Sequence, residues 1–141
     1  MMPAGVYYVG DLCYVMDDDE WDEFCSLTIK GNDCIDGEFN LRDGRRFATY
    51  GTKWGDGEYR DQFGNRYLVD AGLIGCIRFE DIKSVKYGDY SKLGAIIEFK
   101  SDFVTAGGRQ SRDWSGVITI GELRIETDPE FEEEYAYDDE E

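Results

Sequence analysis

Between Tyr50 and Gly75 the sequence places six glycines among aromatic and charged residues, and this stretch constrains the fold more than any other. Glycine adopts positive φ angles that other residues avoid, so closely spaced glycines indicate tight turns. Glu58–Asp61 and Arg66–Asp70 are short runs of strand-forming residues, and the turn Phe63-Gly64-Asn65 separates them. This arrangement predicts a β-hairpin.

Strand and turn patterns continue through most of the chain. Gly5–Gly10 is an apolar run that predicts a strand, and Cys13–Met16 is expected to continue extended. Two further hairpins are expected, one across Asp43-Gly44 and one across Gly121-Glu122.

A central strand is expected at Leu73–Phe79, because apolar residues there occupy both sets of alternating positions. Gly75 inside this run is a candidate β-bulge. Together these patterns predict a mostly β fold, α+β at the margin: a compact antiparallel barrel or sandwich of about eight to ten short strands.

One helix is expected, from about residue 18 to residue 26. Asp17 is placed to cap it, and Glu20 can complete a capping box. Trp21, Phe24 and Cys25 follow at helical spacing and form one apolar stripe. The many acidic residues from Asp17 to Glu23 are interpreted as the solvated face of this capped helix.

The chain has 141 residues and a net charge of -17, and this charge is unevenly distributed. Residues 1–127 are expected to form a single β-rich domain. Residues 128–141 contain nine acidic residues and no basic ones, which predicts a flexible acidic tail that folding does not need. A tail that attracts a basic partner is the alternative. Direct nucleic-acid binding is disfavoured, because it requires clustered lysine and arginine.

The sequence contains no histidine, which excludes histidine-dependent triads and the usual zinc hydrolase sites. The four cysteines are spaced too widely for a metal knuckle. Without a secretion signal or a long apolar run, these cysteines are expected to be free or buried thiols in a cytoplasmic protein. No cofactor and no membrane association are expected.

Four aspartates lie beside or near glycines: Asp11, Asp56, Asp61 and Asp70. They could converge to bind a divalent cation or to perform acid-base catalysis. Alternatively, each could cap its own turn by hydrogen bonding to nearby backbone.

Aromatic residues near the glycine turns are the second group of candidates. Tyr14, Trp54 and Tyr59, with Tyr7, Tyr8 and Tyr67, could form a stacking pocket for a flat ligand or belong to an ordinary sheet core. Arg60 and Arg66 lie on the two arms of one predicted hairpin. They could clamp a phosphate or carboxylate, or pair across the strands with nearby acids.

Several of these motifs also occur together in one family. The chain resembles a small family of uncharacterised proteins from phages, large DNA viruses and some bacteria, over roughly residues 5 to 129. The motifs that carry the resemblance are Tyr7-Tyr8-Val9-Gly10-Asp11-Leu12-Cys13-Tyr14, Trp21-Asp22-Glu23-Phe24, Gly55-Asp56-Gly57, Gly64-Asn65, Val69-Asp70 and Gly121-Glu122-Leu123. Many members have proline in place of Leu12. The family has no known activity, so the resemblance implies only a viral or phage accessory context.

The sequence thus favours a non-enzymatic binding or interaction protein that uses the Gly-Asp loops and neighbouring aromatic residues. Its partner would be a protein or a small molecule, met in the host cytoplasm if the protein is viral. Two alternatives remain. One is a carboxylate- and metal-dependent hydrolase or phosphodiesterase; the other is an acidic mimic of nucleic acid that binds a basic protein.

Overall fold

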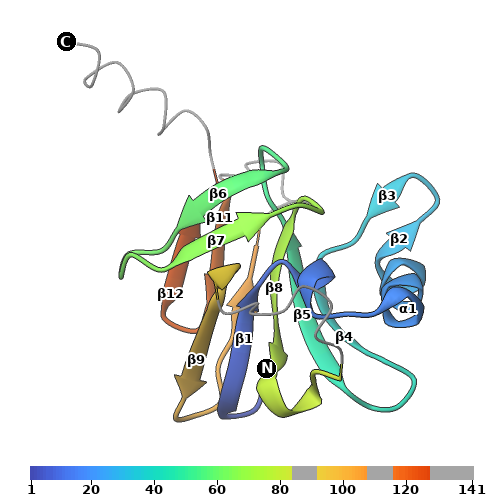
Figure 1. The fold of residues 1–141 in the computed structure, drawn as a ribbon, viewed down its shortest axis with the longest axis horizontal. Helices are drawn as coiled ribbons and strands as arrows, with labels where there is room; N and C mark the ends of the chain where they lie inside the picture. Colours follow the sequence, from blue (N-terminus) through green and yellow to red (C-terminus); the bar gives the residue numbers. More distant parts are fainter. Residues whose placement is uncertain (84–91, 108–115, 128–141) are drawn as a thin grey trace.

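The computed structural model of the chain describes residues 1–83, 92–107 and 116–127, drawn in colour in Figure 1. The acidic segment 128–141 lies outside these residues. The described elements are β1 (Gly5–Gly10), η1 (Leu12–Tyr14), α1 (Asp18–Thr28), β2 (Ile29–Lys30), β3 (Asp33–Cys34), β4 (Gly37–Asn40), β5 (Arg46–Gly51), β6 (Gly57–Arg60), β7 (Arg66–Val69), β8 (Leu73–Arg78), η2 (Phe79–Asp81), β9 (Ala95–Phe99), β10 (Thr105–Ala106), β11 (Val117–Ile120) and β12 (Leu123–Glu126).

The strands form antiparallel sheets, which confirms the predicted mostly β fold with one α-helix. The largest sheet has the order β4-β5-β8-β1-β9, and a second sheet has the order β10-β11-β12. The β6–β7 hairpin lies across one end of the five-stranded sheet (Figure 1). The described strands do not close into a barrel, so the fold is sandwich-like.

The centre of the five-stranded sheet contributes to two apolar clusters, because alternate residues of its inner strands point to opposite faces. In β1, Tyr7 and Val9 pack into one cluster, where the hairpin and the β10–β12 sheet cover them. Tyr8, between them, packs into the other cluster with Phe24 of α1 and Phe47 of β5. The alternation of a strand therefore explains why the inner strands are apolar at nearly every position.

Helix α1 begins as predicted. The Asp17 carboxylate accepts a hydrogen bond from the backbone N–H of Glu20, and the Glu20 carboxylate accepts one from the backbone N–H of Asp17. Phe24 is buried, and Trp21 packs against the same cluster. The helix extends to Thr28, two residues beyond the expected end.

The expected hairpins also form, but two local predictions were wrong. Leu12–Tyr14 is a turn of 3-10 helix rather than extended chain, because Asp11 caps it. Gly75 is not in a bulge, because the pairing of β8 with β1 and with β5 continues through it without interruption.

All four cysteines are free thiols, and Cys76 is buried in the core. Within the described residues, no helix has both the length and the apolar character needed to cross a membrane.

We predict that Gly75→Ala strongly destabilises the fold. A Cβ at this position would lie 2.0 Å from the carbonyl oxygen of Ala48 on the neighbouring strand, so the two central strands would have to separate. We expect a loss of roughly 3 kcal/mol in the free energy of unfolding, measured by denaturant titration.

Gly44→Ala is the matched control. Gly44 has a φ of 95°, but a Cβ added there would meet no atom within 4 Å, so only backbone strain of about 1 kcal/mol is expected. Equal losses for the two variants would show that the contact with Ala48 is not what requires glycine.

Candidate functional site

Asp11, the first of the four candidate aspartates, is fully buried at the end of β1. One carboxylate oxygen accepts a hydrogen bond from the Cys13 backbone N–H, at 3.0 Å. The other accepts two, from the backbone N–H groups of Asp70 at 2.8 Å and Ala71 at 2.6 Å. Burial raises the pKa of Asp11 above its ordinary value, although these N–H groups act to lower it. Asp11 is therefore a structural cap that joins two turns.

Asp61, at the end of β6, caps a different turn. One carboxylate oxygen accepts hydrogen bonds from the backbone N–H groups of Phe63 and Asn65, at 2.8 and 3.0 Å. The other accepts from the Tyr67 hydroxyl at 2.7 Å and from the Asn65 side-chain amide at 2.8 Å. Burial acts to raise the pKa of Asp61, but the hydrogen bonds outweigh it and the pKa is lowered. These bonds fix the tip of the β6–β7 hairpin.

The remaining two aspartates, Asp56 and Asp70, have exposed side chains. Asp70 comes close to Asp11, but the contact is made by the backbone N–H of Asp70 and not by its carboxylate. Across the described ranges, no group of three or more cysteine, aspartate or glutamate side chains is arranged to hold a metal ion. The four carboxylates therefore do not form the common site that the hydrolase alternative requires.

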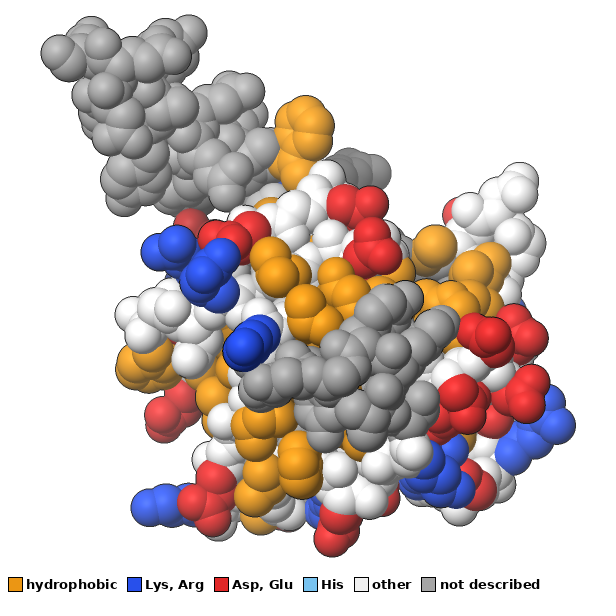
Figure 2. All heavy atoms as spheres, viewed as in Figure 1, with side chains coloured by type: hydrophobic (Ala, Val, Ile, Leu, Met, Phe, Trp, Pro, Cys, Tyr) orange, Lys and Arg blue, Asp and Glu red, His pale blue; other side chains and the backbone are white. Residues whose placement is uncertain are grey.

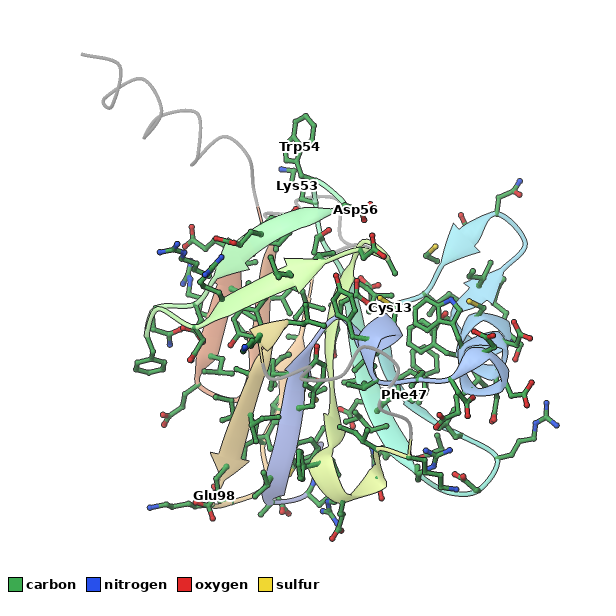
Figure 3. The ribbon with its side chains drawn as sticks, in the orientation of Figure 1. Cys13, Phe47, Lys53, Trp54, Asp56 and Glu98 are labelled. Carbon is green, nitrogen blue, oxygen red and sulfur yellow. The ribbon has the colours of Figure 1, made fainter. Side chains whose placement is uncertain are left out.

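Most of the candidate aromatic residues belong to the core. Tyr7, Tyr8, Tyr59 and Tyr67 are buried, and Tyr14 is half-buried against the cluster beneath α1. Trp54 is the exception. Its side chain is 61% exposed, and it projects from the loop between β5 and β6 beside Lys53 (Figure 3). The structure therefore does not form a pocket from these six aromatic rings.

Hydrogen bonds hold the loop that carries Trp54 at both sides of the tryptophan. Before it, the Thr52 backbone N–H donates to the Gly72 carbonyl at 3.0 Å, and the Lys53 backbone N–H donates to the Thr127 hydroxyl at 3.0 Å. After it, the Gly55 carbonyl accepts from the hydroxyls of Thr52 at 2.6 Å and Tyr59 at 2.9 Å. Residues 52–57, which we call the tryptophan loop, thus present an exposed ring on a fixed backbone.

Arg60 and Arg66 lie directly opposite each other in the β6–β7 hairpin. Both guanidinium groups form ion pairs with the carboxylate of Glu58. The hydrogen bond from Arg66 holds the pKa of Glu58 below its ordinary value. Arg66 is therefore a cross-strand partner of Glu58, which was one of the two interpretations of this pair, whereas Arg60 pairs with Glu58 along the same strand.

Sequence reasoning missed Phe63, which is 66% exposed at the tip of the β6–β7 hairpin. Phe63 lines a groove with Phe99, Phe103 and Val104. A signal was present, because a large apolar side chain inside a short hairpin turn cannot be buried by its own hairpin. Phe63 was interpreted only as part of the turn.

Comparison of the chain with protein-family models, with curated proteins and with solved structures gives no match. The chemistry of the chain's own residues is therefore the basis for any proposal about its function.

We predict that Asp11→Asn destabilises the protein although it preserves the shape of the side chain. Both carboxylate oxygens of Asp11 accept hydrogen bonds from backbone N–H groups. Asparagine has only one side-chain oxygen, and its NH₂ group cannot accept the hydrogen bonds of the other position. We expect a loss of at least about 2 kcal/mol in the free energy of unfolding. Asp70→Asn changes an exposed side chain and should stay within about 0.5 kcal/mol of wild type. A stable Asp11→Asn protein would contradict the capping role.

The Asp61 cap should make stability depend on pH. Because the pKa of Asp61 is lowered on folding, its contribution is present above the ordinary value of 3.8 and is lost as the pH falls through the folded value. Asp61→Asn should therefore cost about 1–2 kcal/mol at pH 7, and this difference should shrink below pH 3.8.

Thermal unfolding of both proteins between pH 2.5 and pH 7 measures this difference. Asp56→Asn, a change to an exposed aspartate, should show no difference across the same range. A pH-independent gap between wild type and Asp61→Asn would show that the charge of Asp61 does not stabilise the fold.

Proposed function

We propose that the protein is a non-enzymatic binding protein, and that its partner docks on the tryptophan loop with Trp54 as the main contact. The observation that carries this proposal is the combination of a 61% exposed tryptophan with a backbone that is hydrogen-bonded on both sides. Folded domains usually bury most of each tryptophan side chain, because contact of the indole ring with water is unfavourable.

A fixed loop lowers the entropy lost on binding, because its backbone is already ordered before the partner arrives. Tryptophan is also strongly enriched among the residues that dominate interface energies. Lys53 and Asp56 flank the ring and are exposed, so they can form polar contacts around it (Figure 3). The loop therefore combines an apolar anchor with a polar surround, as interfaces generally do.

The proposed partner is a protein or a flat small molecule that stacks on the indole ring. Nucleic acid is disfavoured as a direct ligand by the net charge of -17. The resemblance to phage and viral proteins supports an accessory role inside the infected cell, and we include this cytoplasmic setting in the proposal.

Of the alternatives, the hydrolase is the less supported, because Asp11 and Asp61 cap separate turns. The nucleic-acid mimic has one observation in its favour. Figure 2 shows acidic side chains on the side of the molecule that carries α1, where Asp18, Asp19 and Asp22 are exposed. These residues span only one short helix, which is a small surface for imitating a nucleic-acid backbone.

Site-specific cross-linking tests the proposal. We expect that a photoreactive benzoylphenylalanine in place of Trp54 captures a defined partner from a lysate of the native host. The same residue in place of Arg42, which is highly exposed in the turn between β4 and β5, serves as control and should not capture it.

With the partner identified, Trp54→Ala should weaken binding roughly 30-fold or more. It should change the free energy of unfolding by no more than about 0.5 kcal/mol, because the side chain is exposed. Equal capture from positions 54 and 42, or unchanged affinity of Trp54→Ala, would refute the role of the tryptophan loop.

A further inference from the structure

A groove of about 620 Å³ lies along β9, the last strand of the five-stranded sheet. Ile97, Glu98 and Phe99 all line it. Successive residues of a strand point to opposite faces of the sheet, so a groove lined by three in a row follows the edge of the strand. The opposite side of the groove is formed by the tip of the β6–β7 hairpin and the turn between β11 and β12.

The backbone of β9 is paired on one side only. It pairs with β1 from Gly5↔Phe99 to Val9↔Ala95, and within the described residues no second strand pairs with it. An edge of this kind has backbone N–H and C=O groups available to an added strand.

The neighbouring edge of β12 is different, because a side chain occupies it. The Gln62 amide nitrogen donates to the Glu122 carbonyl, and the Gln62 amide oxygen accepts from the Arg124 backbone N–H. Gln62 thus makes the two bonds that a neighbouring strand would make. Of the two strand edges beside the groove, β9 is therefore the one open to a partner.

The apolar part of the groove is formed mainly by aromatic rings. Phe99 and Phe103 stack with their ring centroids 3.9 Å apart, and both contact the edge or face of buried Tyr7. Phe63 and Val104 add side chains that are 66% and 60% exposed. These exposed apolar side chains give an apolar ligand a surface on which to pack.

The charges around the groove are mainly negative. Three carboxylates line it, from Glu98, Asp102 and Glu122, against the single ammonium group of Lys100. A ligand with basic side chains therefore matches the groove better than an acidic one.

We propose that this groove binds an extended peptide segment of a partner protein, which adds to the sheet as a new strand beside β9. Alternate residues of the segment are apolar and enter the groove beside Ile97 and Phe99, while the others are lysine or arginine and lie on the side of Glu98, which alternates with those two residues along β9. This mode combines backbone pairing for affinity with side-chain pockets for specificity. The inference rests on the proposed role as a binding protein and adds a second contact surface to the tryptophan loop.

The test uses a set of fluorescein-labelled peptides of about ten residues, the length of a long strand. Each peptide alternates lysine with one of valine, isoleucine, leucine or phenylalanine, and binding is measured by fluorescence anisotropy. At least one peptide should bind, and its counterpart with glutamate in place of lysine should bind at least about tenfold more weakly.

Two further comparisons identify the site and the mode. Phe63→Ala should weaken binding at least about tenfold, whereas Ile29→Ala, a change to an exposed apolar residue of β2 that does not line the groove, should leave it unchanged. Two sets of peptides carry N-methyl groups on alternate backbone nitrogens, so that each set loses the N–H donors of one edge. Methylation of the edge that faces β9 should abolish binding, and methylation of the other edge should have little effect.

The proposal fails if no peptide of the set binds, if Phe63→Ala binds as well as wild type, or if N-methylation of either edge has no effect. Any of these results would refute the groove proposal alone. The proposal for the tryptophan loop depends on the separate cross-linking experiment at position 54. If Trp54→Ala abolishes peptide binding while Phe63→Ala does not, the peptide binds the tryptophan loop and the groove proposal is wrong.

Discussion

The buried carboxylate of Asp11 connects parts of the chain that lie about sixty residues apart. It ends β1, starts the 3-10 turn after it and binds the backbone N–H groups of Asp70 and Ala71. Burial of a carboxylate is costly unless hydrogen bonds compensate, and three N–H groups do so here. The turn it holds leads directly into β8, the strand that pairs with β1. Asp11 thus links the end of β1 to the turn that leads into β8, its partner in the central sheet.

The double-sided burial of the central sheet determines where exposed apolar surface remains. Most side chains of the inner strands β1, β5 and β8 are buried in the two apolar clusters and are not available to a partner. The most exposed aromatic side chains, Trp54 and Phe63, lie at the periphery of the sandwich, in the tryptophan loop and at the tip of the β6–β7 hairpin. Hydrogen bonds from buried side chains hold the backbone beside both exposed rings. Asp61 accepts one from the backbone N–H of Phe63, and the Tyr59 hydroxyl donates one to the carbonyl of Gly55, next to Trp54.

Local sequence signals predicted the elements of the fold well. The bounds of β1, the capping box of α1 and the hairpins across Asp43-Gly44, Phe63-Gly64-Asn65 and Gly121-Glu122 follow from chemistry within a few residues. The partners of Asp11 could not be predicted, because they come from a turn distant in sequence. The alternation of apolar and polar residues could not distinguish buried Tyr59 from exposed Trp54, because their burial depends on which sheet covers each side chain.

The position of β1 has a consequence for biosynthesis. This first strand lies between β8 and β9, so both of its neighbours are synthesised long after it has left the ribosome. The first of these neighbours, β8, ends at Arg78, which is 68 residues after Gly10, and the strand stays unpaired until that segment has been made. β1 can therefore enter the sheet only after β8 has been synthesised. Until then its apolar side chains lack the partners that bury them in the folded sheet, and such transiently exposed segments are prone to aggregation.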